Sequence, residues 1–538
     1  MNPNKKIILC LVITVFLFIS LSGCILDDLF STDRGTTSFS LNNWYVCDDD
    51  GFPSINLVFS CSDYVIIKLF DPDDAQIDSD YFFSGKKEAV LHLSSYGEIV
   101  TPGSYNLKVY DKNNDWIYQN SFSLEGPDLS ILSCGQKWWE RESYIGGYTL
   151  IGLNMTVKNK GDTPVYPYKV NMVMDSSSFS GVILPAVILP DVSQEIDCVI
   201  YKHDVQGNFT VTLEDRYGNI IGSDSFSAKV VGNVPVKEFS WSYEDLNRRP
   251  KIPMVDFLYD YYNSLDRVQH EDYGLYIFDL YDDPYLDLLV DSIMFGFTSE
   301  NDVEKINYAA SFVQHLEYKK DSDTDSSYEY PRYPVETLFN GGSGGGDCED
   351  LAILAACILD NMGYDVALIR LADHMAVGVS LSQNMLPDYE YYTGSYYFLE
   401  TTTKGKPVGF VPNEYKSPSE IDVFPISSRP LLIHHWRDNN LTIYTKTDLG
   451  DFVKVTTVVE NLGRTTAKNV NVEGAFYTEN GLELNTKMNR ISLLEPGTKK
   501  EITLKVDIPK GMTAWFKTRI YLNGEMVDEK ESADSFPT

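Results

Sequence analysis

The feature that most constrains this chain is a glycine-rich run followed at once by a cysteine and a helical pattern. Residues 341–346 are all glycine except Ser343, and such a run does not hold regular structure. Up to Gly363, apolar residues then recur at spacings of three and four, which predicts a helix: Leu351, Leu354, Ala355, Ile358, Leu359 and Met362. We therefore expect Asp347 to be the N-cap of this helix and Cys348 to lie in its first turn.

A cysteine in the first turn of a helix lies where free backbone N–H groups and the helix dipole stabilise a thiolate. The sequence therefore predicts a lowered pKa for the Cys348 thiol. His374 follows at the start of an apolar, strand-like run, and Glu400 lies inside an aromatic and β-branched run, residues 396–403. A cysteine at a helix start followed by a histidine and an acid on successive strands is an order that can build a Cys-His-acid triad.

The chain here resembles the transglutaminase-like superfamily, which shares a papain-like core with many thiol peptidases. The motifs that carry the resemblance are Tyr-Pro-Val-Glu-Thr-Leu at 333–338, Gly-Asp-Cys-Glu-Asp-Leu-Ala at 346–352, Met-Gly-Tyr-Asp-Val-Ala at 362–367, His-Met-Ala-Val-Gly-Val at 374–379 and Leu-Glu-Thr-Thr at 399–402. The resemblance implies an α+β papain-like core in which Cys348 is the nucleophile, His374 is the base and Glu400 orients the histidine.

Two departures from the family pattern narrow the expected activity. The family's acid is usually an aspartate followed by proline, whereas this chain has Glu400 and Thr401. The family's histidine is often followed by Ala-Trp, whereas this chain has Met375 and Ala376. Both departures favour an amidase or peptidase-like branch over a cross-linking transglutaminase.

The N-terminus has the pattern of a targeting segment. Lys5 and Lys6 precede an apolar run, residues 7–19, that is too short to span a membrane comfortably. Leu-Ser-Gly-Cys at 21–24 then resembles the lipobox of secreted lipoproteins, which implies cleavage after residue 23 and a lipid on Cys24. An uncleaved signal anchor is the alternative. The favoured interpretation is a protein anchored to the cell membrane through Cys24 and facing outside.

Charge excludes some partners. The net charge is −34, and loss of residues 1–23 moves it to −36 because two lysines leave with them. A surface this acidic repels nucleic acid, so no nucleic-acid partner is expected.

The remaining cysteines allow two pairings. Cys47 with Cys61, and Cys134 with Cys198, each fall within one expected domain, so each pair can form a disulfide outside the cell or stay reduced. Cys357 lies on the same predicted helix as Cys348 and too far along it to bridge, so it is expected to be a packing residue.

Residue patterns predict a multidomain protein. An α+β papain/transglutaminase-like core is flanked by all-β immunoglobulin-like sandwiches. Short alternating strands, such as residues 105–110, indicate β structure before and after a helical middle region. Two of the β blocks contain a similar strand that ends in Asn-x-Gly, at residues 153–161 and 454–463, as in adhesion-type modules. The expected boundaries are 1–23 signal peptide, 24–35 linker, 36–125 sandwich, 126–232 sandwich, 235–430 transglutaminase-like domain and 431–535 sandwich.

Other candidate sites are weaker. Asp321, Asp323 and Asp325 resemble the start of a calcium loop, but Ser326 and Arg332 stand where an EF-hand needs glycine and glutamate, so a solvated loop is the favoured interpretation. Histidines outside the triad have no paired spacing to a cysteine that would indicate zinc. The sequence therefore predicts no metal and no cofactor.

The leading hypothesis is a surface-anchored thiol hydrolase, peptidase- or amidase-like, that uses Cys348, His374 and Glu400 on amide bonds of a polypeptide or cell-envelope substrate. One alternative is a non-catalytic surface binding or adhesion protein in which the transglutaminase-like domain is a scaffold. Another is an acyl transferase that uses an amine in place of water.

Overall fold

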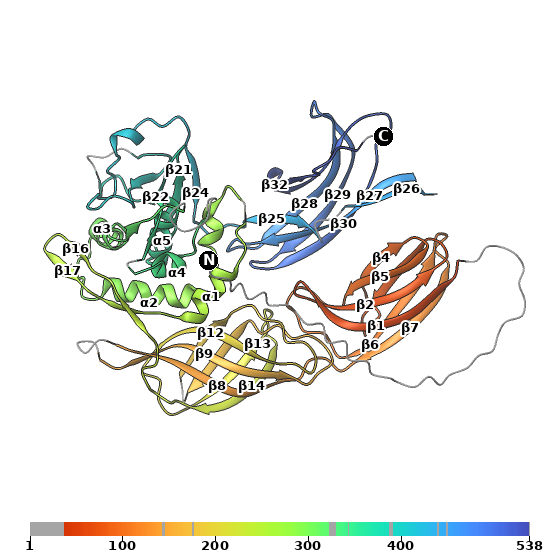
Figure 1. Ribbon diagram of the computed structural model, residues 1–538, viewed down its shortest axis with the longest axis horizontal. Helices are drawn as coiled ribbons and strands as arrows, with labels where there is room; N and C mark the ends of the chain where they lie inside the picture. Colours follow the sequence, from red (N-terminus) through yellow and green to blue (C-terminus); the bar gives the residue numbers. More distant parts are fainter. Residues whose placement is uncertain are drawn as a thin grey trace, which may run out of the picture.

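The computed structural model describes residues 37–141, 146–174, 177–268, 270–321, 330–342, 344–386, 391–437, 441–447 and 450–536. Within these ranges the protein is multidomain and predominantly β. Three β units accompany a unit that holds the helices, which is central in the sequence and lies at the left end of the molecule in Figure 1. The predicted signal peptide and the whole predicted linker, which begins with Cys24, lie outside the described residues. No helix in the described ranges combines the length and the apolarity that a membrane crossing requires.

The first β unit, residues 39–124, is formed by two sheets, β1-β2-β5 and β4-β3-β6-β7, that share one apolar core. The predicted alternation at residues 105–110 is confirmed in β6, where Tyr105, Leu107 and Val109 are buried. Its strands are β1 Phe39–Asp49, β2 Phe52–Cys61, β3 Val65–Phe70, β4 Gln76–Phe82, β5 Gly85–His92, β6 Gly103–Asp111 and β7 Trp116–Leu124.

The second β unit, residues 129–227, is one seven-stranded sheet in the order β14-β13-β10-β11-β12-β9-β8, in place of two separate sheets. Its first and last strands, β8 and β14, also pack against each other, so the sheet is rolled. Register shifts along β8 and between β12 and β9 bend the long strands, which allows one sheet to curve around its own core. The strands are β8 Leu129–Glu140, β9 Tyr148–Asn159, β10 Lys169–Met174, β11 Ser177–Ile183, β12 Ser193–His203, β13 Asn208–Glu214 and β14 Ile220–Ser227.

The last β unit, residues 432–536, again contains two sheets around one core. In one sheet β25, β26 and β30 pair with β27, and the other has the order β29-β28-β31-β32. The strands are β25 Leu432–Trp436, β26 Thr442–Thr447, β27 Gly450–Asn461, β28 Ala467–Tyr477, β29 Glu483–Leu494, β30 Lys499–Asp507, β31 Trp515–Leu522 and β32 Glu525–Glu531.

The two Asn-x-Gly segments form the same buried corner. Asn159 ends β9, and its amide donates to the carbonyls of Thr163 (2.7 Å) and Ile188 (3.0 Å) while its oxygen accepts from Gly161 N–H (3.0 Å) and Asp128 N–H (3.4 Å). The similarity that the sequence shows between these blocks therefore has a structural counterpart at the end of a long central strand.

Asn461 repeats this arrangement at the end of β27. Its amide donates to the carbonyls of Thr465 (2.8 Å) and Leu494 (2.9 Å), and its oxygen accepts from Gly463 N–H (3.1 Å) and Leu431 N–H (3.3 Å). Both asparagines are fully buried, so each corner satisfies the hydrogen-bonding groups of its amide completely.

The central unit, residues 236–426, places helix α5 against a four-stranded antiparallel sheet of order β23-β22-β21-β24. Helices α2, α3 and α4 also contact α5, which is why nearly every α5 side chain is buried. The helices are α1 Asp256–Ser264, α2 Asp283–Met294, α3 Asp302–Val313, α4 Pro334–Phe339 and α5 Cys348–Asn361, with short 3₁₀ turns η1 Tyr273–Tyr276 and η3 Asn413–Tyr415. The strands are β15 Val236–Glu238, β16 Trp241–Tyr243, β17 Leu246–Arg248, β18 Lys251–Pro253, β19 Glu317–Tyr318, β20 Gly345–Gly346, β21 Val366–Arg370, β22 Met375–Ser380, β23 Tyr396–Leu399 and β24 Asp422–Pro425.

Local sequence signals position both ends of α5. The α5 N-cap is Asp347, as predicted, and Gly363 follows its C-terminus with a φ of +88°. Ser299 precedes α3 and is a residue type that often caps helices, but it is not the cap here. Asn301 is the N-cap and accepts from Val303 N–H and Glu304 N–H, whereas the Ser299 hydroxyl contacts Glu304.

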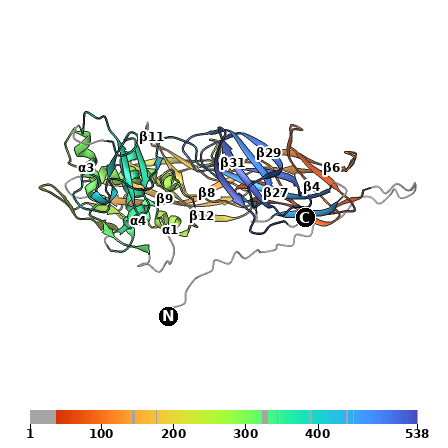
Figure 2. The same cartoon turned by 90° about the horizontal axis from the view of Figure 1, so that it is seen from above.

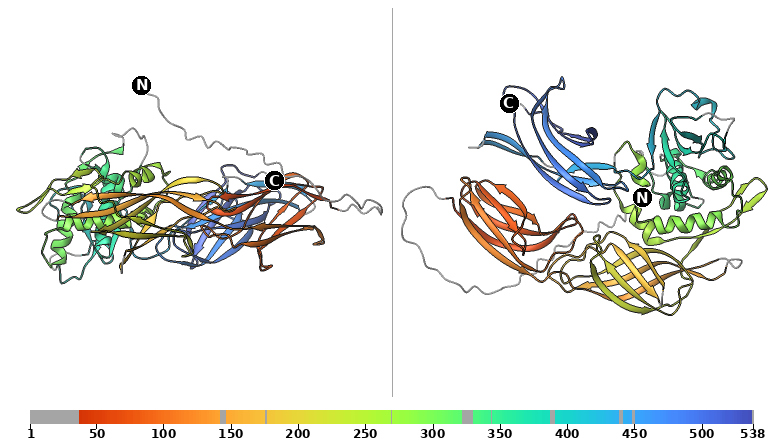
Figure 3. Two further views of the ribbon diagram at one scale, coloured as in Figure 1. Left: turned by 90° about the horizontal axis from the view of Figure 1, so that it is seen from below. Right: turned by 180° about the vertical axis from the view of Figure 1, so that it is seen from behind.

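The four units lie in one flat layer (Figure 2), and the first and last β units are neighbours although they stand at opposite ends of the described chain (Figure 3). Lys499 pairs with Asp50 at 3.0 Å, and Lys454 pairs with Asp80. The second β unit joins the first through Tyr166, whose hydroxyl donates to Asp48 at 2.8 Å. The first β unit therefore contacts both of the other β units.

None of the six described cysteines forms a disulfide. Cys47 lies opposite Ser54 on the β1–β2 ladder, and Ser54 is seven residues from Cys61, about 23 Å along the strand. Cys134 and Cys198 lie on strands that flank β9, which separates their backbones by about 10 Å. Both separations exceed the reach of a disulfide, so the reduced alternative holds for these cysteines.

Candidate active site

The glycine-rich run brings the start of α5 close to β19. Gly345 has a φ of +120° and pairs in parallel with Glu317, and a Cβ at this position would lie 1.9 Å from the Glu317 carbonyl oxygen. At Gly346, a Cβ would lie 2.1 Å from Oδ2 of Asp350. Only glycine fits either position, so the run fixes where the helix begins. Asp347 N–H then donates to the Asp350 carboxylate at 3.3 Å, which helps close the first turn of α5.

Cys348 is the first residue of α5 and is half-buried. The thiol donates to Oε2 of Glu349 at 3.3 Å. Burial raises the pKa of the Cys348 thiol to about 12, and the Glu349 and Asp347 carboxyls raise it further than the Met375 backbone N–H lowers it. The lowered pKa that the sequence predicts is therefore wrong, because burial and two acidic neighbours outweigh the helix terminus.

His374 and Glu400 are brought together by the pairing of two strands. His374 immediately precedes β22 and Glu400 immediately follows β23, and these strands are antiparallel with Val377 opposite Leu399. The side chains meet with His374 Nε2 3.1 Å from Glu400 Oε2, and both are buried. Because Nε2 faces the carboxylate, Nδ1 is the ring nitrogen left to face other groups.

Glu400 is held as a charged acceptor. Burial alone opposes its ionisation, but hydrogen bonds from His374 and Thr402 outweigh that effect and lower the pKa of the Glu400 carboxyl. Thr402 contributes both its backbone N–H, at 2.8 Å, and its hydroxyl, at 2.5 Å, to Oε1. The carboxylate is therefore fixed on one oxygen by Thr402 and presents the other to the imidazole.

Two observations connect the thiol to the strand that His374 precedes. Helix α5 packs against β22, and the N–H that faces the Cys348 sulfur belongs to Met375, the residue after His374. Tyr415 stacks on the His374 ring with centroids 4.7 Å apart and planes 3° apart. Burial raises the pKa of Tyr415, and acidic neighbours that include Glu400 and Cys348 add to the rise. The structure thus pairs His374 with Glu400 and places the Cys348 sulfur against the backbone of Met375, the residue after His374.

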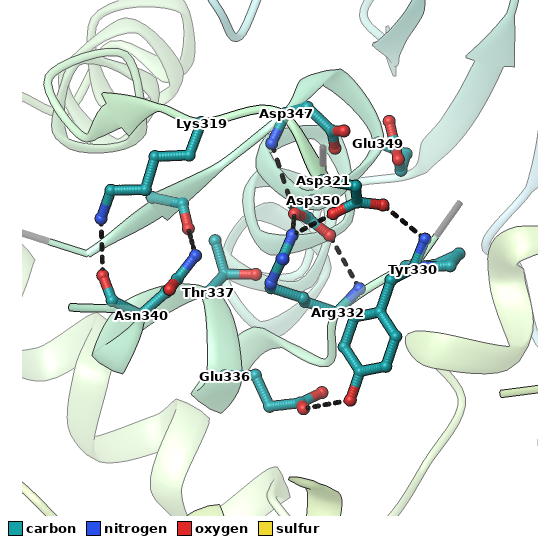
Figure 4. A network of polar contacts seen from close by, with 12 residues as sticks. Lys319, Asp321, Tyr330, Arg332, Glu336, Thr337, Asn340, Asp347, Glu349 and Asp350 are labelled. Carbon is teal, nitrogen blue, oxygen red and sulfur yellow. Dashed lines mark hydrogen bonds and ion pairs between the residues drawn. The ribbon is translucent and has the colours of Figure 1, made fainter. Parts of the chain in front are cut away.

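Buried acids and Arg332 surround the start of α5 (Figure 4). Arg332 pairs with Asp350 and, at 2.8 Å, with Asp321. Asp350 is fully buried, and burial raises its pKa to about 7 although Arg332 opposes the rise. The solvated-loop interpretation is wrong for Asp321, which is buried; Asp323, Asp325 and Ser326 lie outside the described residues.

A second arginine pair lies at α4. Arg267 donates to both oxygens of Glu336 at 2.6 Å; Glu336 is buried, and 10% of the Arg267 side chain is exposed. Sequence reasoning did not find Arg267 and Arg332 as partners of the acids near the nucleophile. They stand 69 and 18 residues from those acids, so no local spacing signals either pair.

Glu349 differs from the other acids near the nucleophile. Only 3% of its surface is exposed, and in the described ranges neither an arginine nor a lysine pairs with it. Burial raises its pKa to about 10, and its interaction with Asp347 adds to the rise. A neutral Glu349 beside a neutral thiol is therefore the resting state at neutral pH.

Comparisons with known proteins give only distant likenesses. No family description and no curated protein matches this chain. Among solved structures, the transglutaminase of red sea bream is 10% identical over 70% of this chain and 79% of its own, with a TM-score of 0.20. A tetra-tandem repeat from the extending region of a large adhesion protein is 11% identical over 92% of this chain and 98% of its own, with a TM-score of 0.16. Scores this low carry no argument about fold or activity.

Proposed function

We propose that the protein is a thiol hydrolase that cleaves amide bonds with Cys348, His374 and Glu400. The observation that carries the proposal is the buried hydrogen bond between His374 and Glu400, held against the helix that begins with Cys348. Its support from the sequence is the resemblance to the transglutaminase-like superfamily, whose nucleophile, base and acid fall on these three residues. An acid bound to one nitrogen of an imidazole that faces a thiol is the arrangement that activates a nucleophile by general-base catalysis.

The protonated resting thiol determines how the reaction begins. A thiol with a pKa near 12 is not a preformed thiolate, so His374 Nδ1 takes the Cys348 proton as the sulfur attacks the carbonyl carbon. Glu400 stabilises the imidazolium that forms and keeps Nδ1 directed toward the sulfur. The Cys348 backbone N–H, which has no acceptor within the helix, donates to the oxyanion.

Collapse of the tetrahedral intermediate completes the first half of the reaction. His374 gives its proton to the leaving amine, the C–N bond breaks and a thioester remains on Cys348. Water then adds to the thioester with His374 as base, and the C–S bond breaks to release a carboxylic acid and the thiol. An amine in place of water would give a new amide, which is the acyl-transfer alternative.

We also propose which domain carries this chemistry and where in the cell it takes place. We infer that residues 235–430 form a papain-like α+β core, and that the flanking β units are immunoglobulin-like modules that present it at the cell surface. A lipid on Cys24 would anchor the mature chain outside the membrane, within reach of polypeptide or envelope substrates. Intact-mass analysis of protein from its native membrane tests the anchor, since retention of residues 1–23 or an unmodified Cys24 would contradict it.

A peptide probe with a thiol-reactive leaving group tests the catalytic proposal without a known substrate. A panel of dipeptidyl acyloxymethyl ketones should label wild-type protein once, on Cys348. His374→Ala should slow labelling by about 100-fold or more, because the base that takes the thiol proton is gone. Cys348→Ala should remove it. Cys134→Ala, which removes another half-buried thiol in the second β unit, is the matched control and should label like wild type.

The labelling results distinguish the thiol hydrolase from the scaffold interpretation. Labelling of Cys348 that does not depend on His374, or no labelling by any probe in the panel, would overturn the hydrolase and leave the scaffold interpretation. If labelling follows the prediction, reaction of a peptide amide in the presence of hydroxylamine separates hydrolysis from acyl transfer. A carboxylic acid product indicates water as acceptor, and a hydroxamate indicates an amine.

A further inference from the structure

Lys319 connects β19 to the glycine-rich run that precedes the nucleophile. It directly follows β19, and its ammonium group donates to the carbonyls of Asn340 at 2.7 Å and Gly344 at 3.0 Å. Its backbone N–H donates to the Gly346 carbonyl at 2.9 Å. Figure 4 shows the Lys319 ammonium group directed toward Asn340. One residue therefore holds the run both beside its first residue and at its last.

Lys237, on β15, binds the end of α4 and the start of the same run. Its ammonium group donates to the carbonyls of Leu338, in the last turn of α4, and Gly341, each at 2.9 Å. The last carbonyls of a helix have no partner within the helix, so a lysine there satisfies one of them. The ammonium group also lies 5.2 Å from the ring centre of Phe239 and 5.7 Å from that of Phe339. Lys237 therefore ties α4 to the run.

The two ammonium groups lie close enough to repel each other. Burial lowers the pKa of the Lys237 ammonium group to about 8, and the Lys319 charge adds to the fall. Among the described residues no acid pairs with Lys237, although the chain has 78 acidic residues, and Lys319 contacts only the exposed Glu317, at 3.4 Å. Two adjacent, partly buried cations cost free energy unless both donate to good acceptors. The backbone carbonyls of this segment are those acceptors.

The glycine-rich run depends on donors from outside for its path. Glycine has the largest backbone freedom of any residue, and the φ angles of +71° at Gly344 and +120° at Gly345 lie where other residues rarely go. A third side chain, Asn340, donates through its amide to the Gly345 carbonyl at 3.0 Å. The run leads directly into α5, so a displaced run would move the Cys348 sulfur and the Cys348 backbone N–H together.

We propose that Lys237 and Lys319 are positioning residues that fix the Cys348 thiol and its backbone N–H relative to His374. This inference rests on the proposed hydrolase and adds two residues that act through the backbone. A displacement of about 1 Å at a reacting group can lower a rate by about 100-fold. Loss of either lysine should therefore slow the chemical step and leave probe binding unchanged, because both ammonium groups donate to backbone carbonyls.

Inactivation by the acyloxymethyl ketone probe measures the effect at pH 7, below the pKa of about 8 for Lys237. Lys237→Met and Lys319→Met keep an apolar stem and remove the donors. Each should lower the maximal inactivation rate about tenfold or more, with the half-saturating probe concentration within about twofold of wild type. Lys305→Met is the matched control and should react like wild type, because Lys305 lies on α3 and pairs with Glu300, whose side chain is 95% exposed.

Hydrogen exchange separates positioning from a general loss of the fold. Deuterium uptake in the peptide that contains residues 340–347 should rise in each lysine variant, while uptake in α5 beyond its first turn stays that of wild type. Wild-type uptake in this peptide, a wild-type inactivation rate, or a loss confined to probe affinity would overturn the proposal.

The two measurements also distinguish failure of this inference from failure of the hydrolase. If no probe labels wild type, the hydrolase fails by itself, and deuterium uptake still decides whether the lysines hold the run. If Lys319→Met fails to fold, Lys237→Met decides by the same two measurements.

Discussion

The asparagine corners of two β units and the acidic start of α5 are both buried and polar, but they differ in how their groups are satisfied. Asn159 and Asn461 each donate twice and accept twice, and all eight partners are backbone groups. At α5, Glu349 contacts the Cys348 thiol on one oxygen and has no hydrogen-bond partner among the described residues on the other.

The difference separates two uses of buried polar side chains. A fully satisfied amide links a strand end to the loops around it, so its loss should cost stability and leave chemistry unchanged. An unsatisfied acid beside a thiol contributes little to stability, and such groups concentrate at sites that bind or react. Cys348, His374 and Glu400 share the region of the unsatisfied acid, which supports the assignment of function to the start of α5.

The largest effect is expected on turnover, when the acid of the candidate triad near the start of α5 is replaced. Glu400→Gln should lower kcat/KM on the order of 10³-fold, because an amide can donate to Nε2 and hold the wrong imidazole tautomer. Hydrolysis of the best peptide amide measures it. Glu414→Gln, an exposed acid next to Tyr415, is the control and should stay within about twofold of wild type. Equal losses in the two variants would contradict the orienting role of Glu400.

The next largest effect is expected on stability at the corners. Asn461→Ala leaves four buried backbone groups without partners, so it should destabilise the last β unit by about 3 kcal/mol. Calorimetric melting measures the loss, and Asn159→Ala should lower the transition of the second β unit similarly. Asn489→Ala, which removes one exposed hydrogen bond to Thr503, should change it by less than about 0.5 kcal/mol. In the Asn461→Ala variant the probe should still label Cys348 as it labels wild type. A loss of labelling in parallel with the loss of stability would contradict the difference between the two regions.

Alkylation of the thiols tests a property that the two regions share. Burial raises the pKa to about 12 for Cys348 and likewise for Cys134 in the second β unit. Iodoacetamide should therefore modify both about tenfold faster for each pH unit between 7 and 9, because only the thiolate reacts. Mass spectrometry of the two cysteine peptides measures the rates. A plateau for Cys348 at acidic pH would indicate a preformed thiolate and contradict the general-base mechanism.

A further effect is expected on how folding stability depends on pH. With its pKa raised to about 10, the folded-state Glu349 keeps a proton that the unfolded chain releases above about pH 4.5. Folding stability therefore falls as pH rises through this window, and Glu349→Gln should remove that part of the fall. Urea midpoints at pH 5 and pH 9, with chelator present, should show the variant gaining on wild type as pH rises. Glu300→Gln should not gain, and parallel curves for Glu349→Gln and wild type would contradict the raised pKa.

The candidate site was partly readable from the sequence. The helix that begins with Cys348, its Asp347 cap and the approach of His374 to Glu400 follow from motifs and chain order, because a strand before and a strand after a turn bring their ends together. The predicted direction of the shift in the Cys348 pKa was wrong. It depends on burial and on the Glu349 carboxyl, neither of which a helix-terminus argument contains.

The sequence by itself determined the features that adjacent residues control. Alternation determined strands such as β6, periodicity determined α5, and repeated Asn-x-Gly segments marked two equivalent corners. Tertiary structure alone decided which distant groups meet. Arg332 with Asp350, Asn461 with Leu494, and Asp321 with Glu349 join residues from different elements. Backbone preferences act over a few residues and leave a pattern in the chain, whereas burial and Coulomb interactions act through space and arise only when the units have packed.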